Sequence, residues 1–201
     1  MRRLTARFKA WASIHGLQHS QGYITPGVLH AVDGYPSLTL KAHNGRLMVV
    51  FLSLSLDTHL ANVRLQGQPG PELLNAAVGA KAICGWFDKL ERGQRFLNQE
   101  EACGIFRDGM AFVAAYERLA LISLRTGGTR WKVHHKMHSF VHLCEDALAL
   151  KQNCRFFHCF RDEDFVGLCK RLCQKVHKGP LCEYRILCRY LMRLNSWRPF
   201  P

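Results

Sequence analysis

The sequence predicts a mainly α-helical protein, a compact bundle of about six helices with a turn-rich N-terminal segment. After residue 46, apolar residues recur at three- and four-residue steps over most of the chain, which is the period of an amphipathic helix. Short Gly- and Pro-containing segments, such as 67–71 and 179–180, separate these stretches and are typical of helix ends. A hydrophobic fraction of 48% in 201 residues can fill a core, so we expect the chain to fold.

The two ends of the chain differ in composition. Residues 1–45 combine a possible short helix, Arg3 to His15, with many turn-forming glycines and prolines, and are predicted to form an N-terminal strap. Residues 46–201 are predicted to form one helical domain. Its C-terminal third, 130–201, holds 14 Lys and Arg against 6 Asp and Glu, whereas residues 1–129 hold 14 against 9.

Helix ends are indicated by capping residues. Pro71 suits the first turn of a helix that Gly93 ends, and Asp57 closes the apolar run that precedes it. Asn98 with Glu101 has the spacing of a capping box. The link over 153–160 reads as irregular. We expect helices over residues 46–61, 72–92, 98–127, 134–150, 162–177 and 180–195.

The charge of the chain indicates a polyanionic partner. A formal net charge of +13 and a pI near 9.6 favour nucleic acid as the partner over an anionic membrane surface. DNA is the nucleic acid that we expect to bind. The longest apolar run, Leu47 to Leu56, is too short to span a membrane, and the N-terminus lacks a secretory pattern. The nine cysteines are therefore expected to be reduced thiols in an intracellular, nuclear protein.

The predicted nucleic-acid-binding residues lie in the basic C-terminal third. On the last helix, arginines recur at four-residue steps on the face opposite Tyr184, Leu187, Cys188 and Leu191, which we expect to point inward. Trp131 and Trp197 stand beside basic residues and could contact bases. The predicted binding residues are Arg130, Lys132, Lys170, Arg171, Lys175, Arg185, Arg189 and Arg193.

Histidines and carboxylates gather between residues 134 and 164. His135, His138 and His142 would lie along one helix face, with Cys144 and Glu145 just beyond it. One interpretation is a nucleic-acid-processing site that combines phosphate-binding imidazoles with metal-binding carboxylates. The other is a half-buried amphipathic helix whose histidines hydrogen-bond to neighbours. The acidic cluster is likewise either a set of metal ligands or a helix cap, and consists of Asp162, Glu163 and Asp164.

Zinc is a further alternative, although no Cys-x2-Cys knuckle is present. The spacing Cys169-x3-Cys173-x3-His177 could place three ligands on one helical face, but it fits core packing equally well. Nearby candidates are Cys154, His158 and Cys159. We do not expect bound zinc, and a zinc-stabilised interaction module stays an alternative.

Three segments in this order resemble the C-terminal part of CACTA-type DNA transposases. They are Lys41-Ala42-His43-Asn44, then His138-x3-His142-Leu143-Cys144-Glu145-Asp146, then the stretch 160–171, which begins Phe160-Arg161-Asp162-Glu163. The resemblance covers about residues 41 to 195. It implies an RNase H-like nuclease with a helical insertion, in which Glu163 takes the place of the last catalytic acid and Asp162 and Asp164 are alternative ligands. His138, His142 and Glu163 are the metal-binding candidates, with Mg²⁺ as the ion if the protein is catalytic.

The chain departs from this family in its upstream acids. Two-metal cleavage needs converging carboxylates, and Asp33 and Asp57 are the only acids before residue 72. We therefore expect a transposase-derived helical protein that binds nucleic acid without catalysis of its own. The alternative is a metal-dependent, DNA-cleaving subunit that completes its carboxylate set from another chain.

Overall fold

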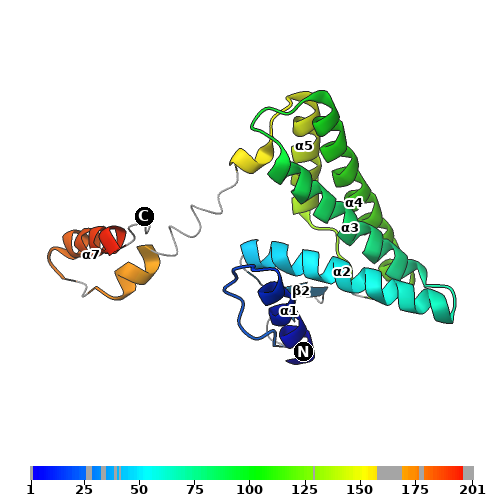
Figure 1. The fold of residues 1–201 in the computed structure, drawn as a ribbon, viewed down its shortest axis with the longest axis horizontal. Coiled ribbons are helices and arrows are strands. Elements are labelled where there is room, and N and C mark those ends of the chain that lie inside the picture. Colours follow the sequence, from blue (N-terminus) through cyan, green and yellow to red (C-terminus); the bar gives the residue numbers. More distant parts are fainter. Residues whose placement is uncertain are drawn as a thin grey trace. The chain divides into compact units, whose positions relative to one another are not determined.

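The chain forms two compact units, Met1–Phe157 (unit 1) and His158–Pro201 (unit 2). The computed structural model describes residues 2–25, 29–32, 35–38, 40, 42–128, 130–157, 169–176 and 179–196. Most of them are helical, which confirms the predicted mainly α class (Figure 1). The predicted division was different, since residues 46–201 were expected to form one domain. Instead the helical bundle ends at Phe157.

Unit 1 is built around three antiparallel helices. Helices α3 (Pro71–Arg92), α4 (Gln99–Arg125) and α5 (His135–Ala149) pack side by side, α4 against both of its neighbours (Figure 1). Helix α2 (Ala42–Gln66) packs against α3 and brings its own apolar side chains to the bundle. The predicted helices over 72–92, 98–127 and 134–150 therefore exist with ends close to those expected. The helix predicted over 46–61 is longer than expected, because α2 begins at Ala42 and continues to Gln66.

Local interactions explain where α3 and α4 begin and end. Pro71 occupies the first turn of α3, where its missing N–H leaves no donor unpaired. At the other end of α3, the Gly93 N–H donates to the Lys89 carbonyl at 2.9 Å. At α4, the Asn98 side chain accepts from the Glu101 N–H, and the Glu101 carboxylate accepts from the Asn98 N–H, both at 2.9 Å. This is the reciprocal capping box that the sequence predicted.

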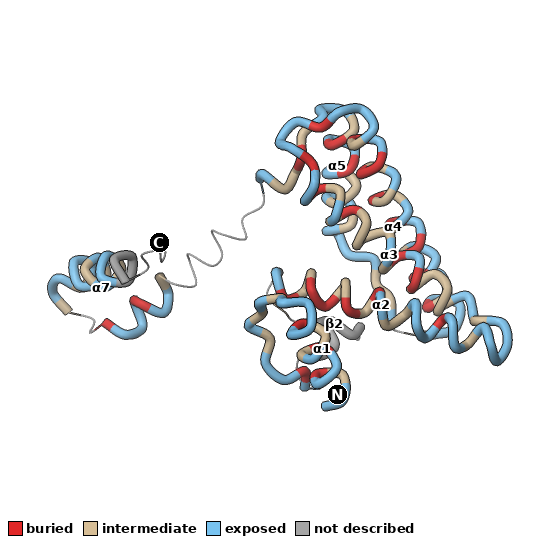
Figure 2. Tube along the Cα trace, viewed as in Figure 1, coloured by how far each residue is buried: buried red, intermediate tan, exposed pale blue. Residues whose placement is uncertain are grey.

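The core of the bundle lies between α3, α4 and α5 (Figure 2). Trp86 and Leu90 of α3, Ile105 of α4 and Cys144 of α5 are buried together. The helices approach closely at Gly109 of α4, where a Cβ atom would lie 2.2 Å from the Cys144 sulfur. A glycine at this position is thus required by packing, since no larger side chain fits without moving α5.

A buried asparagine, four residues after the end of α5, hydrogen-bonds to the C-terminal end of α3. Asn153 is fully buried, and its amide nitrogen donates to the carbonyls of Leu90 at 2.7 Å and Gly93 at 3.1 Å. Its side-chain oxygen accepts from the Arg155 N–H at 3.0 Å. The described part of the link predicted to be irregular forms a 3₁₀ turn, η2 (Cys154–Phe157).

The N-terminal segment holds more regular structure than a strap. Helix α1 (Arg2–Ile14) is followed by an antiparallel hairpin of β1 (Leu29–Val32) and β2 (Tyr35–Leu38), the only strands among the described residues. Phe8 of α1 packs with Met48 and Phe51 of α2 in a second small core. The expected N-terminal helix is confirmed, whereas the hairpin was missed, although Asp33-Gly34 between the paired segments is a sequence typical of two-residue hairpins.

Unit 2 contains a short helical segment over 169–174 and helix α7 (Cys182–Ser196). Leu172 and Val176 are buried. The expected inward face of α7 is wrong, because Tyr184, Leu187 and Leu191 are exposed. The predicted start of the preceding helix, at Asp162, falls outside the described residues.

Candidate functional site

Five of the predicted nucleic-acid-binding side chains lie exposed in unit 2. Three belong to the short helical segment and the turn that follows it, and two to α7: Lys170, Arg171, Lys175, Arg185 and Arg189. None of the five pairs with a carboxylate among the residues that the structure describes. The backbone of Arg193 continues α7, and its side chain is not described. Unit 2 therefore presents unpaired positive charge, with nine Lys and Arg against four Asp and Glu over 158–201.

Two of these arginines border a surface hollow. The hollow has a volume of about 390 Å³ and is lined by Val176 together with Tyr184, Arg185, Cys188, Arg189 and Met192 of α7. The Tyr184 side chain is 63% exposed, so its ring is accessible to a ligand. An aromatic ring beside two guanidinium groups can stack on a base while the cations bind phosphate. The sequence pattern missed Tyr184, because its helical spacing with Leu187 and Leu191 indicated a buried face.

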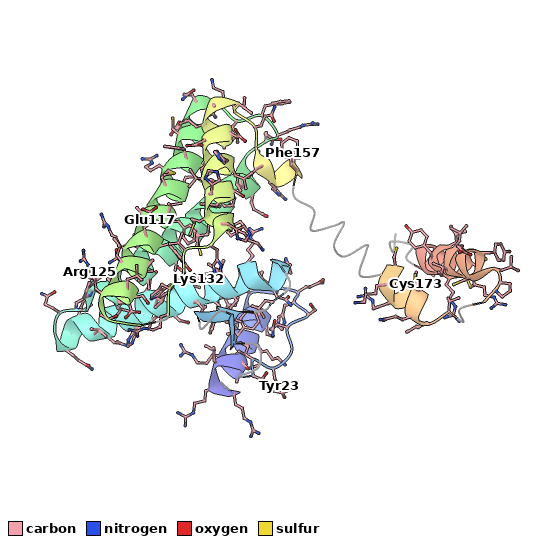
Figure 3. The ribbon with its side chains drawn as sticks, turned by 180° about the vertical axis from the view of Figure 1, so that it is seen from behind. Tyr23, Glu117, Arg125, Lys132, Phe157 and Cys173 are labelled. Atoms are coloured by element: carbon pink, nitrogen blue, oxygen red, sulfur yellow. The ribbon has the colours of Figure 1, made fainter. Side chains whose placement is uncertain are left out.

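The remaining predicted cations lie in unit 1 and have structural contacts. Arg130 forms an ion pair with Glu72 at 3.0 Å, and the Trp131 indole N–H donates to the same carboxylate at 2.8 Å. Trp131 also lines an apolar cavity of about 210 Å³ between α2, α3 and α4. Tyr116 donates to the Lys132 carbonyl at 2.9 Å, and Lys132 lies on the face of unit 1 shown in Figure 3. These contacts fix the 130–132 segment to the bundle, so Trp131 is not free to contact bases.

The histidine face of α5 is exposed. The Nε2 atoms of His138 and His142 lie 2.9 Å apart, and the His142 Nδ1 lies 3.0 Å from a Glu145 carboxylate oxygen. His135 is exposed on the same helix. The interpretation of α5 as a half-buried amphipathic helix is confirmed, since one face is buried and His138 and His142 hydrogen-bond to neighbours on the other. Cys144 does not belong to this face, because it points into the core with Ala147.

The predicted acidic site cannot be located. Asp162, Glu163 and Asp164 lie outside the described residues, so the expected catalytic and metal-binding role of Glu163 remains a prediction. At the other end of the resemblance, Asn44 is buried and has a structural role. Its oxygen accepts from the Ser20 N–H at 3.3 Å, and its nitrogen donates to the Ser20 hydroxyl at 3.1 Å. His43 contacts the Gln18 carbonyl at 3.1 Å.

The cysteines that the structure describes are free thiols in different environments. Burial raises the pKa of Cys144 and of Cys154 to about 11. Cys103 of α4 is exposed, and so is Cys173 of unit 2, which is labelled in Figure 3. Within the described ranges, no group of three or more His, Cys, Asp or Glu residues could hold a metal ion. His158, Cys159 and His177, which the zinc alternative needs, fall outside those ranges.

Comparison with known proteins finds no matching family model, no matching curated protein and no matching solved structure. None of the helices described is long and apolar enough to cross a membrane. The geometry of the basic surface and of the α5 histidines is therefore the observation from which function can be argued.

Proposed function

We propose that the protein binds nucleic acid, with DNA as the expected partner, through the basic surface of unit 2. The observation that carries this proposal is the hollow on α7, where Arg185 and Arg189 stand beside the exposed ring of Tyr184. Phosphate groups attract such unpaired cations, and binding releases the counterions that surround the polyanion. Lys170, Arg171 and Lys175 extend the positive charge of the same unit.

The resemblance to CACTA-type transposases supports the same partner. It leads us to propose a transposase-derived protein that acts on DNA in the nucleus. Arg130 and Lys132 are not included in the proposed surface, because the 130–132 segment is held to the bundle by Glu72 and Tyr116. The proposed surface is therefore smaller than the sequence predicted and lies wholly within unit 2.

Charge reversal tests the proposal. Fluorescence anisotropy with a labelled DNA duplex should show that Arg185→Glu with Arg189→Glu weakens binding at least tenfold, since attraction to phosphate becomes repulsion. The matched control is Lys81→Glu with Arg125→Glu, two exposed residues of unit 1, which changes the net charge equally. Equal weakening by both pairs would show that only net charge matters, and unchanged affinity in the first pair would contradict the proposal.

We further propose that the chain does not cleave DNA by itself, because its upstream carboxylates do not match a two-metal site. Incubation of supercoiled DNA with Mg²⁺ should leave it intact, both with the natural protein and with Glu163→Gln. Metal-dependent nicking that Glu163→Gln abolishes would instead establish the rival function, a DNA-cleaving subunit.

A further inference from the structure

The His138 and His142 side chains on α5 meet on the exposed face of the helix and bring their Nε2 atoms together. Their rings lie at a centroid distance of 4.2 Å, tilted by 77°, and their Nε2 atoms are 2.9 Å apart. Both residues are exposed, one helical turn apart, so an ion can reach both rings from solvent and the rings can turn toward it without a change in the backbone. We propose that this pair is a chelating site for a divalent transition-metal ion such as Ni²⁺ or Cu²⁺.

The distance between the two nitrogens selects the coordination geometry. Metal–imidazole bonds are about 2.0–2.1 Å long, so two such bonds at a right angle place their nitrogens about 2.9 Å apart. A tetrahedral angle would require about 3.3–3.4 Å with the same bond lengths. The 2.9 Å of the hydrogen-bonded pair already equals the separation of neighbouring positions around a square-planar or octahedral ion, the geometry of Cu²⁺ and Ni²⁺ with nitrogen ligands.

Glu145 hydrogen-bonds to the ring nitrogen of His142 that would not bind the metal, a contact that metal-binding histidines commonly have. Its carboxylate lies 3.0 Å from the His142 Nδ1 and accepts the hydrogen bond, which places the proton of His142 on Nδ1. The Nε2 atom then carries a lone pair that faces His138. Glu145 is thus a positioning residue, which fixes the tautomer and the ring orientation of His142.

Metal binding replaces the hydrogen bond between the two rings. With neutral imidazoles and the His142 proton on Nδ1, the hydrogen bond of the metal-free pair requires the His138 Nε2 to donate and the His142 Nε2 to accept. When the ion binds, that proton moves to Nδ1 of His138 by exchange with water, and both Nε2 lone pairs point at the metal. No proton is gained or lost overall. Water molecules fill the other coordination positions, because the described residues offer no third ligand.

The site differs in kind from the magnesium site that the resemblance implied. Mg²⁺ prefers oxygen ligands, whereas two neutral imidazoles favour Cu²⁺, Ni²⁺ and Zn²⁺. Glu163 has no part in it. The inference is also independent of nucleic-acid binding, because it concerns one face of α5 in unit 1 and the proposed DNA surface lies in unit 2.

Calorimetric titration of the full chain with Ni²⁺ tests the site. We expect one site per chain that His138→Ala and His142→Ala each weaken at least tenfold, since either change leaves a single ligand. The matched control is His59→Ala, an exposed histidine on α2, which should leave the affinity unchanged. Circular dichroism should show unchanged helix content in all three variants, because alanine is a strong helix former.

Two further variants and a second readout separate chelation from weak surface binding. Glu145→Ala should lower the Ni²⁺ affinity about tenfold, and Glu145→Gln, which keeps an acceptor, should recover part of the loss. In nuclear magnetic resonance spectra, Ni²⁺ should first broaden the ring signals of His138 and His142, and excess Mg²⁺ should not reverse this. Equal affinity in the natural protein and in His138→Ala, or first broadening at other histidines, would overturn the proposal.

Discussion

Gly109 is the residue at which the packing of the bundle is tightest. A Cβ atom there would lie 2.2 Å from the Cys144 sulfur and 3.3 Å from the Trp86 ring. We expect Gly109→Ala to lower the free energy of unfolding by about 1–3 kcal/mol, because α4 and α5 would have to separate. The control is Gly45→Ala in α2, where the space is open, and which should be neutral or stabilising by up to about 1 kcal/mol. Denaturant unfolding measures both.

A double substitution tests the stated cause. Removal of the sulfur in Cys144→Ala leaves only the Cβ atom of residue 144, which is 3.4 Å from the new methyl group. The cost of Gly109→Ala should therefore be smaller in the Cys144→Ala background than in the natural protein. Additive costs would show that the sulfur contact is not the reason for the glycine.

The cysteines provide a second residue-scale prediction. Thiolates are the reactive form, and burial raises the pKa of Cys144 and Cys154 to about 11. In the native protein at pH 8, N-ethylmaleimide should label Cys103 and Cys173 rapidly and Cys144 and Cys154 slowly, with all four labelled quickly after unfolding. Mass spectrometry of digested protein identifies the sites. Labelling of native Cys144 as fast as Cys103 would contradict its burial.

The raised pKa of Cys144 also predicts a dependence of stability on pH. The folded protein holds the thiol proton up to about pH 11, whereas an unfolded cysteine loses it near pH 9. Its contribution is complete below pH 9 and is lost as the pH rises from 9 to 11, by on the order of 2 kcal/mol at most. The free energy of unfolding should fall less steeply over this interval in Cys144→Ala, and equal slopes would contradict the shift.

At the scale of elements, Asn153 links the end of α5 to the end of α3, a contact that the sequence pattern does not predict. Its amide donates to two carbonyls at the end of α3, and Asn153→Asp would replace this donor with an acceptor that repels them. We expect a loss on the order of 3 kcal/mol in the free energy of unfolding. Asn75→Asp is the matched control, a partly exposed asparagine that donates to the Pro71 carbonyl, and should cost less than about 1 kcal/mol. Equal costs would mean that burial is unimportant here.

Most helices were predictable because their signals are local. The capping box at Asn98, the proline at 71 and the apolar period over 72–92 act within one or two turns of chain. The hairpin between β1 and β2 also has a local signal, Asp33-Gly34, which was missed. The close approach at Gly109 and the donors of Asn153 depend on residues brought together by folding. The inward face predicted for α7 was wrong, since helical spacing indicates an apolar face but not whether another element covers it.

The candidate sites were predictable to a similar extent. The period of the α5 histidines correctly placed His138 and His142 together, and the arginine spacing correctly placed Arg185 and Arg189 outward. The sequence did not reveal that Glu145 orients His142, or that Glu72 holds Arg130 and Trp131. Both depend on the rotamers and partners of long polar side chains, which composition and period do not determine.

At the scale of the whole molecule, unit 1 has its own cores and should fold without unit 2. Its clusters around Trp86 and around Phe8 are formed entirely by residues before 158. A chain ending at Phe157 should retain cooperative thermal unfolding, with a midpoint within a few degrees of that of the full protein. A molten, non-cooperative transition would show that unit 2 is needed for the fold of unit 1.

The same truncation separates the two proposed sites. The shortened chain should keep Ni²⁺ binding, because His138, His142 and Glu145 all belong to unit 1, and should lose most of its DNA affinity. Loss of Ni²⁺ binding from a folded truncated chain would contradict the chelate on α5. Retention of full DNA affinity would move the nucleic-acid surface to unit 1.

The salt dependence of DNA binding tests the central claim, that the basic surface of unit 2 contacts phosphate, most directly. A plot of log affinity against log salt concentration has a slope of about −0.9 for each phosphate neutralised. Replacement of Arg185 and Arg189 by Gln should therefore reduce the size of this slope by about 2, whereas Lys81→Gln with Arg125→Gln in unit 1 should leave it unchanged. The same slope in all three proteins would contradict the claim.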